Sequence, residues 1–143
     1  MKIRKAKKED LKEITRIYRE EYSKKPYNEK WTGKTAIIRV KYLLKNSIII
    51  IAEENKKIIG AISFFIFPWA IKLKGYVEDF IVDSKFQNKG VGSKLLERAE
   101  KEIKKKGGRD VWMEVHRKSR AFKFYKKRGY ISTKYQTLEK KLK

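Results

Sequence analysis

The sequence predicts an α/β (α+β) fold, with a mixed, mostly antiparallel central sheet and helices on both of its faces. Two observations support this prediction. Apolar, β-rich runs follow one another at residues 48–53, 57–67 and 75–82, and a tight polar turn at residues 54–56 joins the first two as a hairpin. Amphipathic helical patterns stand before and after these runs. With 143 residues, 41% of them hydrophobic, and no visible linker, the chain is expected to form one domain over residues 1–143.

A short strand and two helices are predicted ahead of the hairpin. Residues 1–5 form the strand. Apolar residues recur at helical spacing from residue 9 to residue 22, and a second helix follows a loop at residues 23–33. The two apolar faces consist of Leu11, Ile14, Ile17, Tyr18 and Tyr22 in the first helix, and of Ala36, Ile37, Val40, Leu43 and Leu44 in the second.

The second half of the chain continues the alternation of strands and helices. Pro68 and Trp69 are expected to end the second strand of the hairpin. A glycine-rich loop then leads into a helix that stops at Gly107 and Gly108. The remaining elements are a strand at residues 110–116, a helix at 120–128, and two short strands at 130–135 and 137–142. The predicted order is therefore β-α-α-β-β-β-α-β-α-β-β.

The composition narrows the classes of function. The chain has 39 Lys and Arg residues and 17 Asp and Glu residues, which gives a formal charge of +22. This charge would attract polyanions. Alternatively, the lysines form a solvated surface of the kind that is typical of thermophile proteins. It has no cysteine and a single histidine, His116, so no metal site is expected. The N-terminus lacks the apolar core of a signal peptide, which predicts a cytoplasmic protein with no membrane partner.

The loop at residues 87–92 has the pattern of an anion site. Gln-Asn-Lys-Gly-Val-Gly stands between a predicted strand and a predicted helix, where unpaired N–H groups and the helix dipole favour negative charge. Gly90 and Gly92 would let a phosphate approach the backbone closely, and Lys89 adds a positive charge. The spacing is neither that of a P-loop nor that of a dinucleotide fingerprint, which disfavours nucleoside triphosphate chemistry.

Two segments together resemble a known family. Residues 82–96 are similar to the acetyl-CoA-binding loop of the GNAT acetyltransferases, Q/R-x-x-G-x-G/A after a strand and before a helix. Residues 121–130, AFKFYKKRGY, resemble the A-x-x-x-Y-x-x-x-G-F/Y segment of the same family. The predicted order of elements also matches that of the family, so the resemblance covers nearly the whole chain.

The resemblance implies acetyl-CoA as co-substrate, with no metal. Its pyrophosphate would bind the backbone amides of the loop, and its pantetheine arm would pair with the strand before the loop as an added strand. The implied cofactor-binding residues are Phe80, Ile81, Val82, Gln87, Asn88, Lys89, Gly90, Val91, Gly92 and Ser93. Lys118 stands near the place of a family asparagine that often touches the cofactor.

Acetyl transfer to an amine requires an acid and a base. Tyr125 matches the tyrosine of the family whose hydroxyl protonates the departing thiolate; the alternative is a core aromatic with no chemical role. Glu78 and Glu114 both interrupt apolar strands, where an unpaired carboxylate is costly but can accept a proton from an amine. Either could instead pair with one of the many basic residues.

The segment around Glu78 and Asp79 is similar to the diamine (polyamine) branch of the superfamily, in which this pair faces the substrate amine, whereas Glu114 matches the base of ribosomal-protein N-terminal acetyltransferases. We favour Glu78 as the base and keep Asp79 and Glu114 as alternative base or amine-binding residues. In a regular strand Glu78 and Asp79 point to opposite faces, so only one lines the cleft unless a bulge intervenes. Loop aromatics Tyr27, Trp31 and Trp69 are candidates for its rim.

The sequence thus predicts an acetyl-CoA-dependent N-acetyltransferase that acts on a primary amine by direct attack. A small (poly)amine is the first candidate for the acceptor, and a protein N-terminus or lysine is the alternative. A basic nucleic-acid-binding module without catalysis is the alternative from another class, although no recognition motif accompanies the charge. If the protein is an enzyme, we expect nucleic acid to bind it only through non-specific charge. The sequence is compatible with either a monomer or a homodimer.

Overall fold

The computed structural model describes all residues, 1–143, and contains a five-stranded sheet in the order β1-β2-β3-β4-β5. Only the β4–β5 pair is parallel, so the sheet is mixed and mostly antiparallel, as predicted. The strands are β1 (Lys2–Lys5), β2 (Ile48–Glu54), β3 (Lys57–Trp69), β4 (Lys72–Val82) and β5 (Gly108–Met113). The helices are α1 (Leu11–Tyr22), α2 (Gly33–Asn46), α3 (Val91–Lys105) and α4 (Arg120–Lys127), with single 3₁₀ turns η1 (Lys8–Asp10) and η2 (Ser84–Phe86).

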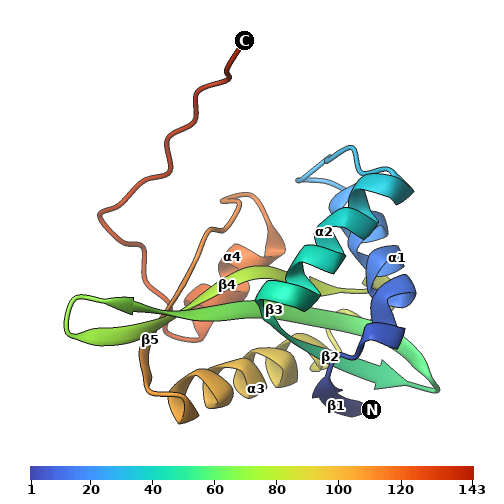
Figure 1. Cartoon of the computed structure of the whole chain (residues 1–143), viewed down its shortest axis with the longest axis horizontal. Coiled ribbons are helices and arrows are strands. Elements are labelled where there is room, and N and C mark those ends of the chain that lie inside the picture. The colour runs from blue at the N-terminus through green and yellow to red at the C-terminus, as the bar shows by residue number, and fades with distance from the viewer.

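Helices cover both faces of the sheet, because successive strand residues point to opposite sides. In β2, Ile49 and Ile51 pack with α1 and α2, whereas Ile50 and Ala52 pack with α3. Figure 1 shows the same division, with α1 and α2 on one side of the strands and α3 on the other. The apolar faces predicted for the helices supply these two cores, from Ile17 and Val40 on one side to the buried residues of α3 on the other. Ile37 is the exception: it belongs to the apolar face predicted for the second helix but is 38% exposed.

Two strands end at other residues than predicted. Pro68 does not end β3, because it lies opposite Leu73 near the end of a hairpin that runs on to Trp69. Proline is tolerated at such a strand end, where a ladder N–H is not needed. The strand predicted at residues 110–116 ends at Met113.

The two C-terminal strands predicted at residues 130–135 and 137–142 do not form. The structure has no helix or strand after Lys127. Figure 1 shows this segment running away from the sheet. A strand is stable when pairing and a buried face offset the entropy of ordering the chain. Here Ile131, Leu138 and Leu142 are 82%, 89% and 88% exposed, so the segment gains no such burial.

The pairing of β4 is irregular on both of its edges. Its parallel pairing with β5 runs from Leu73 opposite Gly108 to Val77 opposite Met113, whereas β4 itself continues to Val82. The last part of β4 therefore has a free edge on the β5 side. On its other side the register with β3 shifts at Glu78, which has no partner across the ladder.

Candidate active site

The register shift at Glu78 is a β-bulge that brings two consecutive carboxylates to one side of the sheet. Ser63 pairs with Asp79 and Phe64 with Val77, which leaves Glu78 as the extra residue. Glu78 accepts a short hydrogen bond from the hydroxyl of Ser47, the C-cap of α2, and Asp79 contacts α1 and α2 as described below. The bulge thus meets the condition under which both acids can line one cleft.

That cleft has a volume of about 1370 Å³ and opens where β4 and β5 separate. Glu78, Asp79, Phe80, Glu114 and Tyr125 all line it. Its walls come from α1, the loop before α2, α2, β4, β5, the loop after β5, α4 and the C-terminal segment. Most of the chemical residues that the sequence singled out therefore meet in one cavity.

Asp79 is engaged by two neighbours that the sequence did not single out as functional. Its carboxylate accepts a hydrogen bond from the Tyr18 hydroxyl at 3.3 Å and an ion pair from the Arg39 guanidinium at 3.0 Å. Burial, and then the negative charge of Asp79, raises the pKa of Tyr18 well above its ordinary value, so this phenol remains a hydrogen-bond donor. Asp79 is thus a paired anion, whereas Ser47 is the hydrogen-bond partner of Glu78.

Tyr125 lies on α4 with a phenol that keeps its proton. The residue is only 6% exposed, and burial raises the pKa of its hydroxyl far above the ordinary value of 10. The rings of Phe80, Phe124 and Tyr130 lie 5.9, 5.5 and 5.4 Å away, centroid to centroid, and hold its orientation. A protonated phenol that lines a cleft has the chemistry of a general acid.

Glu114 also lines the cleft and lies just beyond the end of β5. It is exposed and accepts a hydrogen bond from the Tyr76 hydroxyl at 3.0 Å. Burial, together with this contact, raises the pKa of Tyr76 to about 12. Glu114 is the more solvated of the two glutamates, because Glu78 is only partly exposed.

The glycine loop presents an array of free backbone donors. No N–H group from Gln87 to Ser93 donates a hydrogen bond to the chain, and the first to do so is that of Lys94, to the Gly90 carbonyl at 3.2 Å. Gly90, the N-cap of α3, has a φ of 82°, which side-chain-bearing residues rarely adopt. These unpaired donors at a helix N-terminus fit a phosphate group.

The second glycine of the loop has a packing role as well. A Cβ atom at Gly92 would lie 3.3 Å from the ring of Phe80, so the absence of a side chain lets the start of α3 approach β4. On β4, Ile81 is buried in the core shared with α1 and α2. The carbonyl of Val82 accepts a hydrogen bond from the Gln87 side chain at 2.9 Å. The residues predicted for the two parts of the cofactor are therefore neighbours.

Of the three aromatic residues considered for the rim, two line the cleft. Trp31 stacks edge-on against Tyr18 at 5.0 Å, and Tyr27 lies 5.9 Å from the ring of His116. Trp69 instead lies on the β3–β4 hairpin, near Trp112 and outside the cleft. Sequence reasoning missed Arg39 and Ser47 altogether, because a single arginine among 39 basic residues and a serine after a helix carry no signal of their own.

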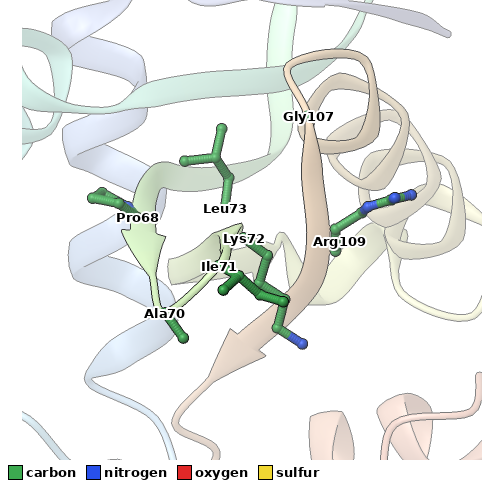
Figure 2. Close-up of a pocket in the computed structure, with 7 residues that line it drawn as sticks. All are labelled: Pro68, Ala70, Ile71, Lys72, Leu73, Gly107 and Arg109. Carbon is green, nitrogen blue, oxygen red and sulfur yellow. The ribbon is translucent and has the colours of Figure 1, made fainter.

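A second, smaller hollow of about 430 Å³ lies at the tip of the same hairpin and is drawn in Figure 2. Apolar side chains, Lys72 and Arg109 line it. It contains no carboxylate and none of the predicted site residues, so it is separate from the candidate active site.

Comparison with known proteins identifies the class. A family model described as "Acetyltransferase (GNAT) family" matches residues 11–130. The chain therefore belongs to this family and is an N-acetyltransferase; enzymes of the family use acetyl-CoA as co-substrate. A comparison with curated protein sequences gives no match.

Solved structures share the fold at low sequence identity. Glucosamine-6-phosphate N-acetyltransferase from Arabidopsis thaliana is 23% identical, with a TM-score of 0.74 over 97% of each chain. An aminoglycoside acetyltransferase from an uncultured soil metagenomic sample is 22% identical, with a TM-score of 0.77 over 99% of this chain and 96% of that one. A transcriptional regulator from Bacillus halodurans C-125 is 18% identical, with a TM-score of 0.80 over 99% of both chains. The predicted fold class and family are confirmed.

The structure also bears on metal binding and on membrane insertion. No group of three or more His, Cys, Asp or Glu side chains is arranged to hold a metal ion. None of the helices has the length and apolar character needed to cross a membrane.

Proposed function

We propose that the protein transfers the acetyl group of acetyl-CoA directly to a primary amine, with Glu78 as the base and Tyr125 as the acid. The observation that supports this most is the bulge at Glu78, which turns a carboxylate into the cleft that Tyr125 also lines. A regular strand would direct the two consecutive acids to opposite faces.

The donor would be held by the loop and the end of β4. The free N–H groups from Gln87 to Ser93 would bind the pyrophosphate, with Lys89 adding positive charge. The free edge of β4 from Glu78 to Val82 leaves Phe80 and its neighbours able to pair with an extended amide-bearing arm. When bound, acetyl-CoA supplies an acetyl thioester whose carbonyl carbon an uncharged amine can attack.

Glu78 would remove a proton from the ammonium group of the acceptor, and Tyr125 would protonate the departing thiolate. A primary amine is an ammonium ion near neutral pH, so Glu78 must first accept one proton, directly or through a water molecule. Tyr125 holds its own proton because of burial and would give it to the sulfur atom as the carbon–sulfur bond breaks. The attacking nitrogen loses its second proton at this stage, and that proton would restore the Tyr125 phenol, directly or through a water molecule. The products are an N-acetylated amine and a free thiol.

The acceptor we favour is a small cationic amine such as a (poly)amine. Four acidic residues (Glu29, Glu78, Asp79 and Glu114) and four basic residues (Arg39, Arg117, Lys126 and Lys134) line the cleft, so it is less positive than the rest of a chain whose formal charge is +22. Aromatic side chains of α1 and the following loop form part of its wall, and such rings can contact a cation with their faces. The same open cleft could admit the N-terminus or a lysine of an acidic protein, which is the alternative acceptor.

Release of free thiol from acetyl-CoA tests the proposal against a panel of amines. We expect turnover with primary diamines or polyamines and little with neutral alcohols. Acetyl-CoA at about one hundred times its dissociation constant should add roughly 2.7 kcal/mol to the free energy of unfolding. The donor assignment is wrong if millimolar acetyl-CoA leaves the melting temperature unchanged, and the acceptor is a protein if only peptides are acetylated.

A further inference from the structure

Arg120 joins the donor loop to the start of α4. Its two terminal nitrogens donate to the side-chain oxygens of Gln87 and Asn88, each at 2.9 Å. The amide nitrogen of Gln87 in turn donates to the carbonyl of Val82 at 2.9 Å. One guanidinium therefore connects the end of β4, the loop and the first residue of α4.

The loop needs such a support at Asn88. This residue has a φ of 62°, in the left-handed region that costs energy for any residue with a side chain. Asparagine tolerates this conformation better than most residues, but no backbone hydrogen bond of its N–H group holds it. The contact with Arg120 is the hydrogen bond that ties its side chain to another element.

We propose that Arg120 is a positioning residue that holds the loop in its phosphate-binding conformation by bridging two amide oxygens, rather than by supplying charge to the phosphate. This inference rests on the donor site of the proposed function. Each terminal nitrogen of Arg120 donates one hydrogen bond to an amide oxygen of the loop, whereas Lys89, whose ammonium lies 5.5 Å from the Phe86 ring centroid, is the cation within the loop itself. The planar fork of an arginine presents N–H groups from two separate nitrogens in a fixed geometry, whereas a lysine has the same charge on a single nitrogen without the fork.

Arg120 therefore acts on donor affinity more than on the chemical step. Tyr125 lies on the same helix, but α4 is held to α3 and β4 independently of Arg120. Arg128 donates a short hydrogen bond to the Ser93 hydroxyl, and Phe124 packs against Phe80 with ring centroids 5.7 Å apart. Loss of the bridge should loosen the loop while Tyr125 stays in place.

The test compares Arg120→Lys and Arg120→Met with Lys123→Met, which removes one charge from an exposed position of the same helix. Calorimetry measures the dissociation constant of CoA, and thiol release measures kcat and KM. We expect both Arg120 variants to bind CoA about tenfold more weakly, the effect of one or two lost hydrogen bonds, and Lys123→Met to bind it as the wild type does. Turnover of acetylpantetheine, a thioester without the pyrophosphate, should be unchanged in all three variants.

Each other outcome would overturn the inference. If Arg120→Lys binds CoA as the wild type does, Arg120 acts by its charge alone. If neither variant changes CoA affinity, the bridge has no role, and an equal loss with acetylpantetheine would mean that α4 itself has moved. Failure of the wild type to bind CoA would instead overturn the donor site, and with it the inference.

A double-mutant cycle gives a second measurement should Arg120→Met unfold. Gln87→Ala removes one acceptor of the bridge and its tie to Val82. Groups that act as one network give non-additive losses, so Gln87→Ala combined with Arg120→Lys should bind CoA no more weakly than the worse single variant. Fully additive losses would show that the two residues act separately and would contradict the proposal.

Discussion

The two halves of the active site are built in different ways. The half proposed to bind the donor is contiguous in the chain, from Phe80 to Ser93, and its ligands would be backbone N–H groups and a strand edge. The acceptor half consists of side chains from α1, α2, β4, β5 and the C-terminal segment, such as Tyr18, Arg39 and Glu114. A backbone site depends on local conformation, whereas a side-chain site depends on how distant elements pack.

This difference predicts which substitutions each half of the site tolerates. The proposed donor half depends on glycine at defined positions and on the few side chains that hold the loop, those of Gln87, Asn88 and Arg120. The acceptor half depends on individual pairings, such as that of Asp79 with Arg39 at 3.0 Å. Substitutions in the two halves should therefore affect different measurable constants.

The largest effect is expected for Glu78→Gln. The variant should lower kcat about 1000-fold at pH 7, because an ammonium ion cannot attack until a base removes its proton. The defect should shrink as the pH approaches about 10, where primary amines lose the proton in solution. Glu114→Gln is the control and should retain most of the activity; a larger loss in that variant would make Glu114 the base.

A smaller loss, about 100-fold in kcat, is expected for Tyr125→Phe. A thiolate is a better leaving group than an amine, so its protonation contributes less than removal of the ammonium proton. Because burial raises the pKa of the Tyr125 hydroxyl above 10, the wild type should show no loss of activity from ionisation of this group up to that pH. Tyr130→Phe is the matched control, and full activity of Tyr125→Phe would make this residue a core aromatic only.

Gly90→Ala addresses the donor half directly. At a φ of 82° an alanine costs about 1 to 2 kcal/mol of stability, so the free energy of unfolding and the affinity for CoA should both fall. Gly33→Ala is the control, because this glycine lies in α2, where the added carbon meets Arg19 at an ordinary 3.6 Å. Denaturant titration with and without CoA measures both effects; unchanged CoA affinity would mean that the loop does not hold the donor.

The smallest effect is expected for Arg39→Gln in the acceptor half. Removal of the guanidinium frees the Asp79 carboxylate for a substrate cation, so KM for a diamine should fall about threefold, while that for acetyl-CoA stays constant. Lys41→Gln changes the same charge at an exposed position of α2 and should alter neither constant. An equal change in KM for the diamine and in KM for acetyl-CoA would contradict the prediction, because it would show that Arg39 affects the donor and acceptor halves alike.

Much of the fold follows from periodicity. The alternation of Ile49, Ile50 and Ile51 between two cores and the helical spacing of Ile14 and Ile17 are properties of short segments, so the order up to α4 was predictable. The C-terminal strands were not, because a strand depends on a partner that lies elsewhere in the chain. Their prediction overlooked that Ile131 and Leu138 would find no surface to cover.

The sequence by itself determined the family and pointed to the loop that we propose binds the donor. The strand, Gly90, Gly92 and the following helix are local features whose backbone groups need no distant partner. It also identified Glu78, Asp79 and Tyr125 as residues of interest. Only the tertiary structure decided that a bulge turns both acids into one cleft, that Arg39 neutralises Asp79, and that Arg120 bridges the loop to α4. Each of these depends on the register of paired strands or on contact between side chains far apart in the chain, which short-range patterns do not encode.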